Sequence, residues 1–282
     1  MKSMLILTDF SENAFRAAEY ACQLAIPLQI GHVILYHAYQ PFIVATDLPA
    51  NIPPNDQETY AENMEALGLQ HDRLRSVLPQ HISIEMQAEN SVLPERINQL
   101  CREKTVELMV MGASSKSGME KFLTGSTSSL MVETSEAPLL IVPPDVPLGH
   151  TLSDIIFTTD LEDPAALSVH QLYKFLDVLP AKLHVVNIAP QTGEQYSPQT
   201  RDAIDAMHRI FEKYNAEFHY VDKVDTPDTT AGILDFAAQY RASLIIAVPK
   251  KHSFVYDLFH KSVSKTLAKK SDVPLLYLPS RQ

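Results

Sequence analysis

The chain has 282 residues, of which 45% are hydrophobic and 20% are charged, with a formal net charge of −11. This length suits two domains of ordinary size, and the apolar content is enough for a packed core in each. The acidic balance argues against a general affinity for nucleic acid or anionic membranes. With 2 cysteines and no long apolar run, we expect a soluble protein of the reducing cytoplasm, without disulfide framework, membrane span or signal peptide.

The sequence contains an internal repeat. Apolar runs that end in Thr-Asp occur at 4–9 and 155–160, and each precedes a helical pattern. Runs that begin Pro-Leu-Leu occur at 138–143 and 274–279, and the second copy is shorter in its middle. Self-similarity of this kind indicates two copies of one structural unit. We therefore expect two domains, residues 1–146 and 147–282.

Apolar runs and amphipathic stretches alternate through each copy. The unbroken run 108–111 is typical of a strand in a parallel sheet covered on both faces. Ala14, Ala17 and Ala21 have the spacing of a buried helix face, and Ser11 is a suitable N-cap. The pattern predicts an α/β fold of two tandem doubly wound domains, each with a five-stranded parallel sheet. In chain order, the first copy should contain a strand at 3–8, a helix at 12–25, a strand at 32–37, a helix at 57–76, a strand at 82–87, a helix at 92–103, a strand at 107–111, a helix at 126–135 and a strand at 139–142.

Ligands of doubly wound sheets bind at the C-terminal ends of the strands, where the winding reverses. In the first copy these ends are Thr8-Asp9, His37-Ala38 and Met111-Gly112. Asp9 is a candidate ligand contact, and the alternative is a bond to the turn that follows its strand. A bond from His37 to a neighbouring loop is a better interpretation than catalysis.

The segment that follows the fourth strand is rich in glycine and hydroxyl side chains. Gly112, Gly118 and Gly125 allow backbone N–H groups to approach a ligand closely. Gly125 and Ser126 stand where a helix should begin, and free N–H groups there favour a bound phosphate. Lys116 supplies a cation. The alternative is a plain turn, with Ser126 capping its helix.

These motifs resemble those of the universal stress protein family. The family's nucleotide-binding signature, Gly-x2-Gly-x9-Gly-Ser/Thr, stands here as Gly112-x2-Ser115-x9-Gly125-Ser126. The run 7–11, Leu-Thr-Asp-Phe-Ser, is similar to the family's opening strand and loop, and 138–143 is similar to its closing strand. The resemblance covers nearly the whole chain, twice, and is weakest in the middle of each copy.

The resemblance implies a fold like that of the adenine nucleotide alpha hydrolases and, as in many members, a site for ATP, with or without magnesium. It places the acidic side chain of Asp9 by the adenosine, Ala38 against the base and the glycine loop around the phosphates. Ser115 departs from the signature, because its side chain can crowd the phosphates or donate a bond to them. The expected cofactor-binding residues are Thr8, Asp9, Ala38, Gly112, Ser115, Lys116, Gly118, Gly125, Ser126 and Thr127.

The second copy has lost the glycines of this signature. Val248, Lys251 and Lys261 stand at the glycine positions, and Pro249 removes a backbone donor. A family-type ATP site is therefore not expected there. Two interpretations remain for the surrounding basic cluster, a side-chain anion site or a degenerate site whose charges are solvated. The cluster comprises Lys250, Lys251, His252, His260 and Lys261.

Several kinds of chemistry have no motif in this chain. There is no P-loop, no dinucleotide fingerprint, no nucleophile elbow and no His-Glu-x-x-His, and the 11 histidines lack metal-ligand spacing. We therefore expect no catalytic residues and no metal ligands. The expected function is a stress protein that senses ATP. The alternatives are an interaction scaffold that binds no nucleotide and, more weakly, slow ATP hydrolysis.

The resemblance also implies partners and assembly. Single-domain members of the family dimerise through their last strands, so the runs 139–142 and 275–278 should pair within this chain. The two domains would then form an internal pseudo-dimer. Protein partners and a further homodimer stay open.

Overall fold

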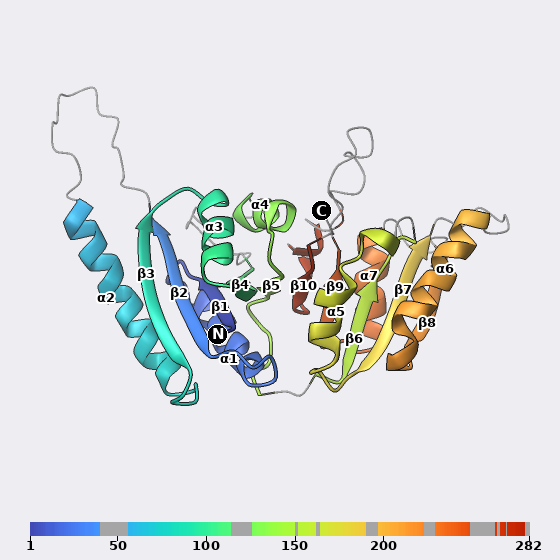
Figure 1. The fold of residues 1–282 in the computed structure, drawn as a ribbon, viewed down its shortest axis with the longest axis horizontal. Coiled ribbons are helices and arrows are strands. Elements are labelled where there is room, and N and C mark those ends of the chain that lie inside the picture. Colours follow the sequence, from blue (N-terminus) through green and yellow to red (C-terminus); the bar gives the residue numbers. More distant parts are fainter. Residues whose placement is uncertain are drawn as a thin grey trace, which may run out of the picture.

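The strands of both copies form one continuous sheet in the computed structural model (Figure 1). The strand order is β3-β2-β1-β4-β5-β10-β9-β6-β7-β8, which places the first five strands in one half and the last five in the other. Neighbouring strands are parallel within each half, and β5 pairs antiparallel with β10. The residues that the structure describes are 1–39, 56–113, 126–149, 152–161, 164–189, 197–222, 229–248, 263, 266–268 and 270–279.

The first half alternates strands and helices as the sequence predicts. Its strand order of β3-β2-β1-β4-β5 reverses direction between β1 and β4, which defines a doubly wound sheet. Its elements are β1 (Ser3–Leu7), α1 (Glu12–Ala25), β2 (His32–Tyr39), α2 (Asp56–Arg75), β3 (Ser83–Asn90), α3 (Glu95–Glu103), β4 (Val106–Gly112), α4 (Ser126–Thr134) and β5 (Leu139–Val142).

The second half repeats this topology with a shorter middle, as expected. The helix that precedes its outermost strand, α6, has 14 residues where α2 has 20. Its elements are β6 (Asp154–Thr158), the 3-10 turn η1 (Pro164–Ala166), α5 (Val169–Leu176), β7 (Lys182–Ala189), α6 (Pro198–Phe211), η2 (Glu212–Tyr214), β8 (Glu217–Asp222), α7 (Thr229–Gln239), β9 (Leu244–Ala247) and β10 (Leu275–Tyr277).

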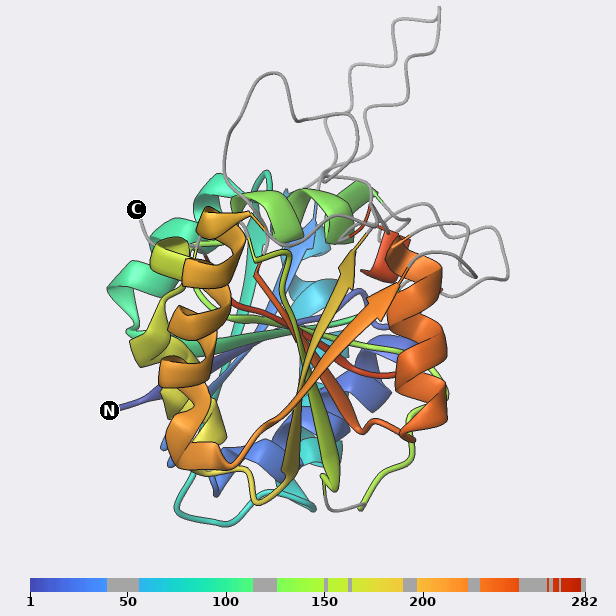
Figure 2. The same cartoon turned by 90° about the vertical axis from the view of Figure 1, so that its right-hand side faces the viewer.

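Helices cover both faces of the sheet (Figure 2). One hydrophobic core contains side chains of α1, α2, α5 and α6, and a second contains side chains of α3, α4 and α7. The strands contribute alternate residues to the two cores, so that β1 gives Met4 and Ile6 to one and Leu5 and Leu7 to the other. Burial on both faces explains the unbroken apolar runs of the central strands.

The junction of the two halves lies in the middle of the sheet. Leu140 of β5 is opposite Leu276 of β10, and both are almost fully buried. The runs expected to pair within the chain therefore do so. Across the same junction, the Lys174 ammonium on α5 lies 2.7 Å from the Glu107 carboxylate on β4.

The middle of the first half shows the largest departure from the predicted boundaries. β3 runs to Asn90, three residues further than expected, and α3 begins at Glu95 instead of 92. Pro94 explains the later start, because a proline disfavours helical conformation at the residue before it. None of the described helices combines the length and the apolar character needed to cross a membrane.

Both cysteines are free and buried, Cys22 in α1 and Cys101 in α3. Burial raises the pKa of each thiol to about 12. At neutral pH both are protonated and pack as small apolar side chains.

Candidate functional site

The strand register brings three of the predicted strand ends together. β1 lies between β2 and β4, with Leu7 opposite Tyr36 and Ile6 opposite Val110. Asp9, Ala38 and Gly112 lie two residues beyond Leu7, Tyr36 and Val110, respectively. Because the three strands are parallel, these residues lie at one edge of the sheet. This edge is the C-terminal side of the point where the winding reverses, where doubly wound sheets bind ligands.

Thr8 and Asp9 form a tight turn between β1 and α1. The Phe10 N–H donates to Thr8 Oγ1 at 3.1 Å, and Phe10 adopts a positive φ of 64°. Asp9 Oδ1 accepts from the Ser11 N–H at 3.1 Å and from the Ser11 hydroxyl at 2.6 Å. Ser11 in turn accepts from the Ala14 N–H and caps α1, as predicted. Asp9 therefore makes the turn contacts that were the alternative to ligand contact.

The second half keeps the same turn without the glycine signature. The Leu161 N–H donates to Thr159 Oγ1 at 3.1 Å, and Leu161 has a φ of 60°. The carbonyl of Thr159 accepts from Asn187 Nδ2 at 2.9 Å, where that of Thr8 accepts from His37 Nδ1 at 2.8 Å. The Thr-Asp motif is thus explained by backbone geometry in both halves. By itself it is no sign of a bound nucleotide.

Gly112 ends β4 at a place where α1 comes very close. A Cβ at this position would lie 3.1 Å from both Nδ2 and the backbone oxygen of Asn13. The amide of Asn13 donates to the Ala113 carbonyl, and its Oδ1 is buried with no partner among the described residues. Gly112 therefore has a packing role that the sequence did not reveal. Asn13 also presents an acceptor that still needs a donor.

An ionic network that the sequence analysis missed stands beside Ala38. Glu89 of β3, which pairs with Ala38, accepts from Arg96 of α3 at 2.6 and 2.8 Å. Tyr36 also donates to Glu89, at 3.1 Å. Arg96 holds the pKa of Glu89 below its ordinary value, and burial raises the pKa of Tyr36 to about 12. The network fixes the start of α3 against β3. No local pattern marks it, because its members come from two strands and a helix.

The glycine loop itself lies outside the described residues. Ser115, Lys116, Gly118 and Gly125 all fall within 114–125, which the structure does not describe. Ser126 and Thr127 form the start of α4, where the sequence predicts a helix. In the second half the basic cluster of 250–261 is likewise outside the described part, and Val248 directly follows β9. The contacts of the loop therefore stay predictions.

A cavity of about 490 Å³ lies at the opposite edge of the sheet. Its lining includes Thr105 and Val106 at the start of β4 and Lys174 and Phe175 of α5. It is far along the strands from Asp9 and Gly112, since it surrounds the N-terminal ends of the same strands. It is therefore separate from the candidate site.

His37 is expected to make folding sensitive to mild acid. Burial lowers the pKa of His37 below the ordinary 6.5, and the hydrogen bond to the Thr8 carbonyl and the charge of Asp9 offset this only in part. The unfolded chain then binds a proton at a higher pH than the folded chain, so stability is lost as the pH falls through 6.5 towards the folded pKa. Urea unfolding at several pH values measures this. His37→Gln should reduce the loss, whereas His81→Gln, which changes an exposed histidine, should not. Equal pH dependence in all three proteins would contradict the prediction.

Comparison with known proteins identifies the family. The model of the universal stress protein family matches residues 1–143. The universal stress protein MJ0531 of Methanocaldococcus jannaschii is 24% identical over 144 residues, which cover 50% of this chain and 81% of that protein. The chain belongs to the universal stress protein family.

Solved structures show the same architecture over the whole chain. A universal stress protein from Archaeoglobus fulgidus aligns over 99% of this chain and 96% of its own, with a TM-score of 0.71 and 19% identity. A putative universal stress protein from Pseudomonas aeruginosa aligns over 99% and 93%, with a TM-score of 0.63 and 14% identity. These similarities confirm the predicted tandem fold.

Proposed function

We propose that the first half of this universal stress protein binds ATP or another adenine nucleotide and that the protein acts as a nucleotide sensor in a stress response. The observation that carries the proposal is the position of the family signature. Gly112 ends β4 beside the turn of Asp9. The helix α4, which starts at Ser126, packs its buried side chains into the same hydrophobic core as those of β4. A glycine loop that joins these two points begins at the edge where such sheets bind ligands.

The proposed contacts use groups that the fold leaves in place. The described bonds of Asp9 use Oδ1, so Oδ2 is the oxygen assigned to an adenosine hydroxyl. Ala38, next to the last residue of β2, is assigned to the base because the resemblance to the family implies that contact. The loop amides and Ser126 and Thr127 are assigned to the phosphates, with Lys116 and a magnesium ion as counter-charges. The orphaned Asn13 Oδ1 is an acceptor for a loop amide.

The same proposal covers the organisation of the chain. Residues 1–146 and 147–282 are the two domains, and only the first binds nucleotide. The boundary falls where the Val146 carbonyl accepts from Arg16 Nη2 at 3.1 Å, which ties the end of the first domain to α1. We assign no enzymatic turnover, and we place the protein in the cytoplasm. A nucleotide-dependent surface would be offered to protein partners.

Binding is tested by calorimetric titration of the purified full-length protein with ATP and magnesium, after removal of any co-purified nucleotide. We expect saturable binding of one ATP per chain. Gly125→Lys places at this position the residue that the second half has there, Lys261. The variant should not bind ATP, because the long side chain would occupy the space proposed for the phosphates. Lys261→Gly, the reverse change at the matching position, should leave the affinity unchanged.

Two results would overturn the proposal. Without saturable binding at millimolar ATP, the protein is better described as an interaction scaffold with vestigial sites. Unchanged affinity in Gly125→Lys would show that the phosphates bind elsewhere. The far-ultraviolet circular dichroism of each variant should match the parent protein, which separates loss of the site from loss of the fold.

A further inference from the structure

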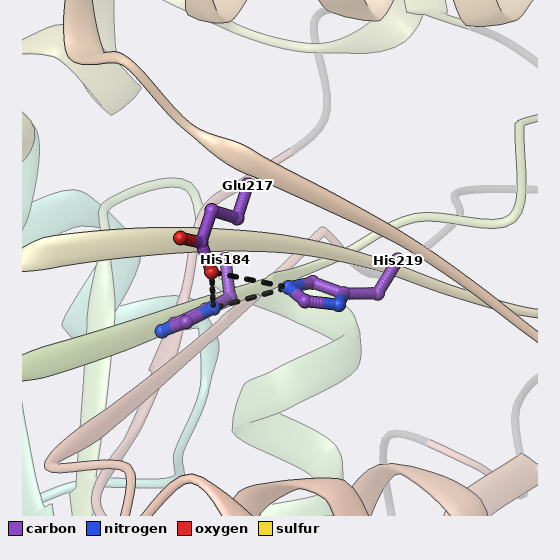
Figure 3. Close-up of side chains that lie close together, drawn as sticks. All are labelled: His184, Glu217 and His219. Carbon is purple, nitrogen blue, oxygen red and sulfur yellow. Dashed lines mark hydrogen bonds and ion pairs between the residues drawn. The ribbon is translucent and has the colours of Figure 1, made fainter.

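A cluster of two histidines and a glutamate lies in the second half, far from the candidate nucleotide site. His184 comes from β7, and Glu217 and His219 come from β8 (Figure 3). His184 Nδ1 lies 3.1 Å from His219 Nε2 and 3.6 Å from Glu217 Oε2, and His219 Nε2 lies 3.9 Å from the same oxygen. Three ligand atoms therefore face one point between two neighbouring strands.

The spacing of these atoms suits a divalent metal ion. The nearest point equidistant from all three atoms lies in their plane, about 2.1 Å from each, and a tetrahedral ion about 0.7 Å out of that plane would lie about 2.2 Å from each, close to the usual Zn–N and Zn–O bond lengths. In a tetrahedral site with such bonds, ligand atoms are about 3.4 Å apart, within the range of the three separations. Two histidines and one carboxylate, with a fourth position for water, form an established zinc geometry in proteins.

A fourth side chain prepares His184 for this role. Asp154 Oδ1 of β6 lies 3.1 Å from His184 Nε2. As the carboxylate can only accept, it fixes the proton on Nε2 and leaves a lone pair on Nδ1, which faces the other two ligands. A carboxylate behind a metal-binding histidine is the usual supporting contact in zinc sites. Without metal, His219 Nε2–H can donate to that lone pair, and metal binding moves this proton to His219 Nδ1.

The surroundings leave one side of the cluster open. The His184 side chain is fully buried against Phe236 and Tyr240 of the α7 region, whereas that of Glu217 is 47% exposed. Lys182 binds the other carboxylate oxygen, Oε1, at 2.8 Å. This contact neutralises part of the acidic charge and turns Oε2 towards the histidines. An ion would therefore enter from the Glu217 side.

The matching strands of the first half, β2 and β3, carry no counterpart of this cluster at their described positions. There Ile34 is opposite Glu85 and Tyr36 is opposite Gln87, whereas His184 is opposite Glu217 and Val186 is opposite His219. The second half therefore places a fully buried histidine where the repeat has isoleucine. A buried polar group at a core position is costly unless its bonds are satisfied. The fold alone does not require the cluster.

We propose that His184, Glu217 and His219 bind a zinc ion through Nδ1, Oε2 and Nε2, with Asp154 as the positioning residue. The ion links β7 to β8, the last strand at this end of the sheet order. The expectation that the histidines form no metal site came from their spacing along the chain. Glu217 and His219, two residues apart on one face of a strand, were the only local signal.

The site is tested with Co²⁺ as a spectroscopic probe for zinc in the full-length protein. After treatment with a chelator, one equivalent of Co²⁺ should produce the visible absorption bands of a four- or five-coordinate ion, and Zn²⁺ should abolish them by competition. Zinc should also raise the melting temperature of the protein. Absence of both the bands and the temperature shift would overturn the proposal.

Variants assign the binding to these residues. His219→Gln and Glu217→Gln should each weaken Co²⁺ binding at least about 100-fold, and Asp154→Asn should weaken it about 10-fold. The matched control is His32→Gln, which removes the 3.0 Å contact of His32 with Glu85 in the first half. This variant should bind Co²⁺ as tightly as the parent protein. Full binding in His219→Gln would place the ion elsewhere in the chain and contradict the proposal. Circular dichroism without metal confirms that each variant is folded.

Discussion

Replacement of Leu276 by alanine is expected to lower the free energy of unfolding by about 2–5 kcal/mol. Leu276 is 2% exposed and stands opposite Leu140, which is 1% exposed, at the antiparallel junction of the two halves. Truncation removes apolar contacts on which both halves depend and leaves a cavity between them. Urea unfolding followed by circular dichroism measures the change.

The control for this variant is the same substitution on the surface. Leu69 of α2 is 67% exposed, so Leu69→Ala should change stability by no more than about 0.5 kcal/mol. If Leu276→Ala proves as mild as Leu69→Ala, the junction does not carry the stability that its burial implies.

Replacement of Gly112 by valine should lower the free energy of unfolding by about 1–3 kcal/mol. The new Cβ would stand 3.1 Å from the backbone of Asn13, and the added methyl groups would push α1 away from β4. Valine is the residue that the second half has at this position, Val248. The substitution therefore tests whether the close approach of α1 to β4 in the first half requires a glycine at this position. Thermal unfolding and urea unfolding both report the loss.

A second glycine provides the comparison for Gly112. Gly68 lies inside α2, and a Cβ there would meet nothing within 4 Å. Gly68→Ala should therefore raise stability by about 0.5–1 kcal/mol through helix propensity. Tolerance of valine at Gly112 would mean that the signature glycine serves the ligand alone and has no packing role.

The fold was predictable from the sequence because its signals are local. An unbroken apolar run predicts a strand at 108–111, and the structure has β4 there. Alanines at helical spacing predict a helix at 12–25, and the structure has α1 there. Boundaries set by tertiary contact were less accurate. The longer β3 and the later start of α3 follow from the contacts of Glu89 with Arg96 and from Pro94.

The candidate site was predictable only where a motif follows a strand. The positions of Asp9, Ala38 and Gly112 at one edge follow from parallel register, and the structure confirms that placement. The bond between Asn13 and Ala113 joins residues 100 positions apart, and that between His184 and His219 joins residues 35 positions apart. Such contacts depend on which strands become neighbours, and periodicity carries no information about their side chains.

The joining of β5 to β10 within one polypeptide has a consequence for how the protein can change. In a dimer of identical subunits every substitution occurs in both subunits, so a substitution that impairs one site impairs the matching site of the other subunit as well. Here each half occupies its own stretch of gene. The two halves can therefore differ at matching positions, as at Gly112 and Val248 or at Ile34 and the buried His184, and one continuous sheet can carry two unlike sites.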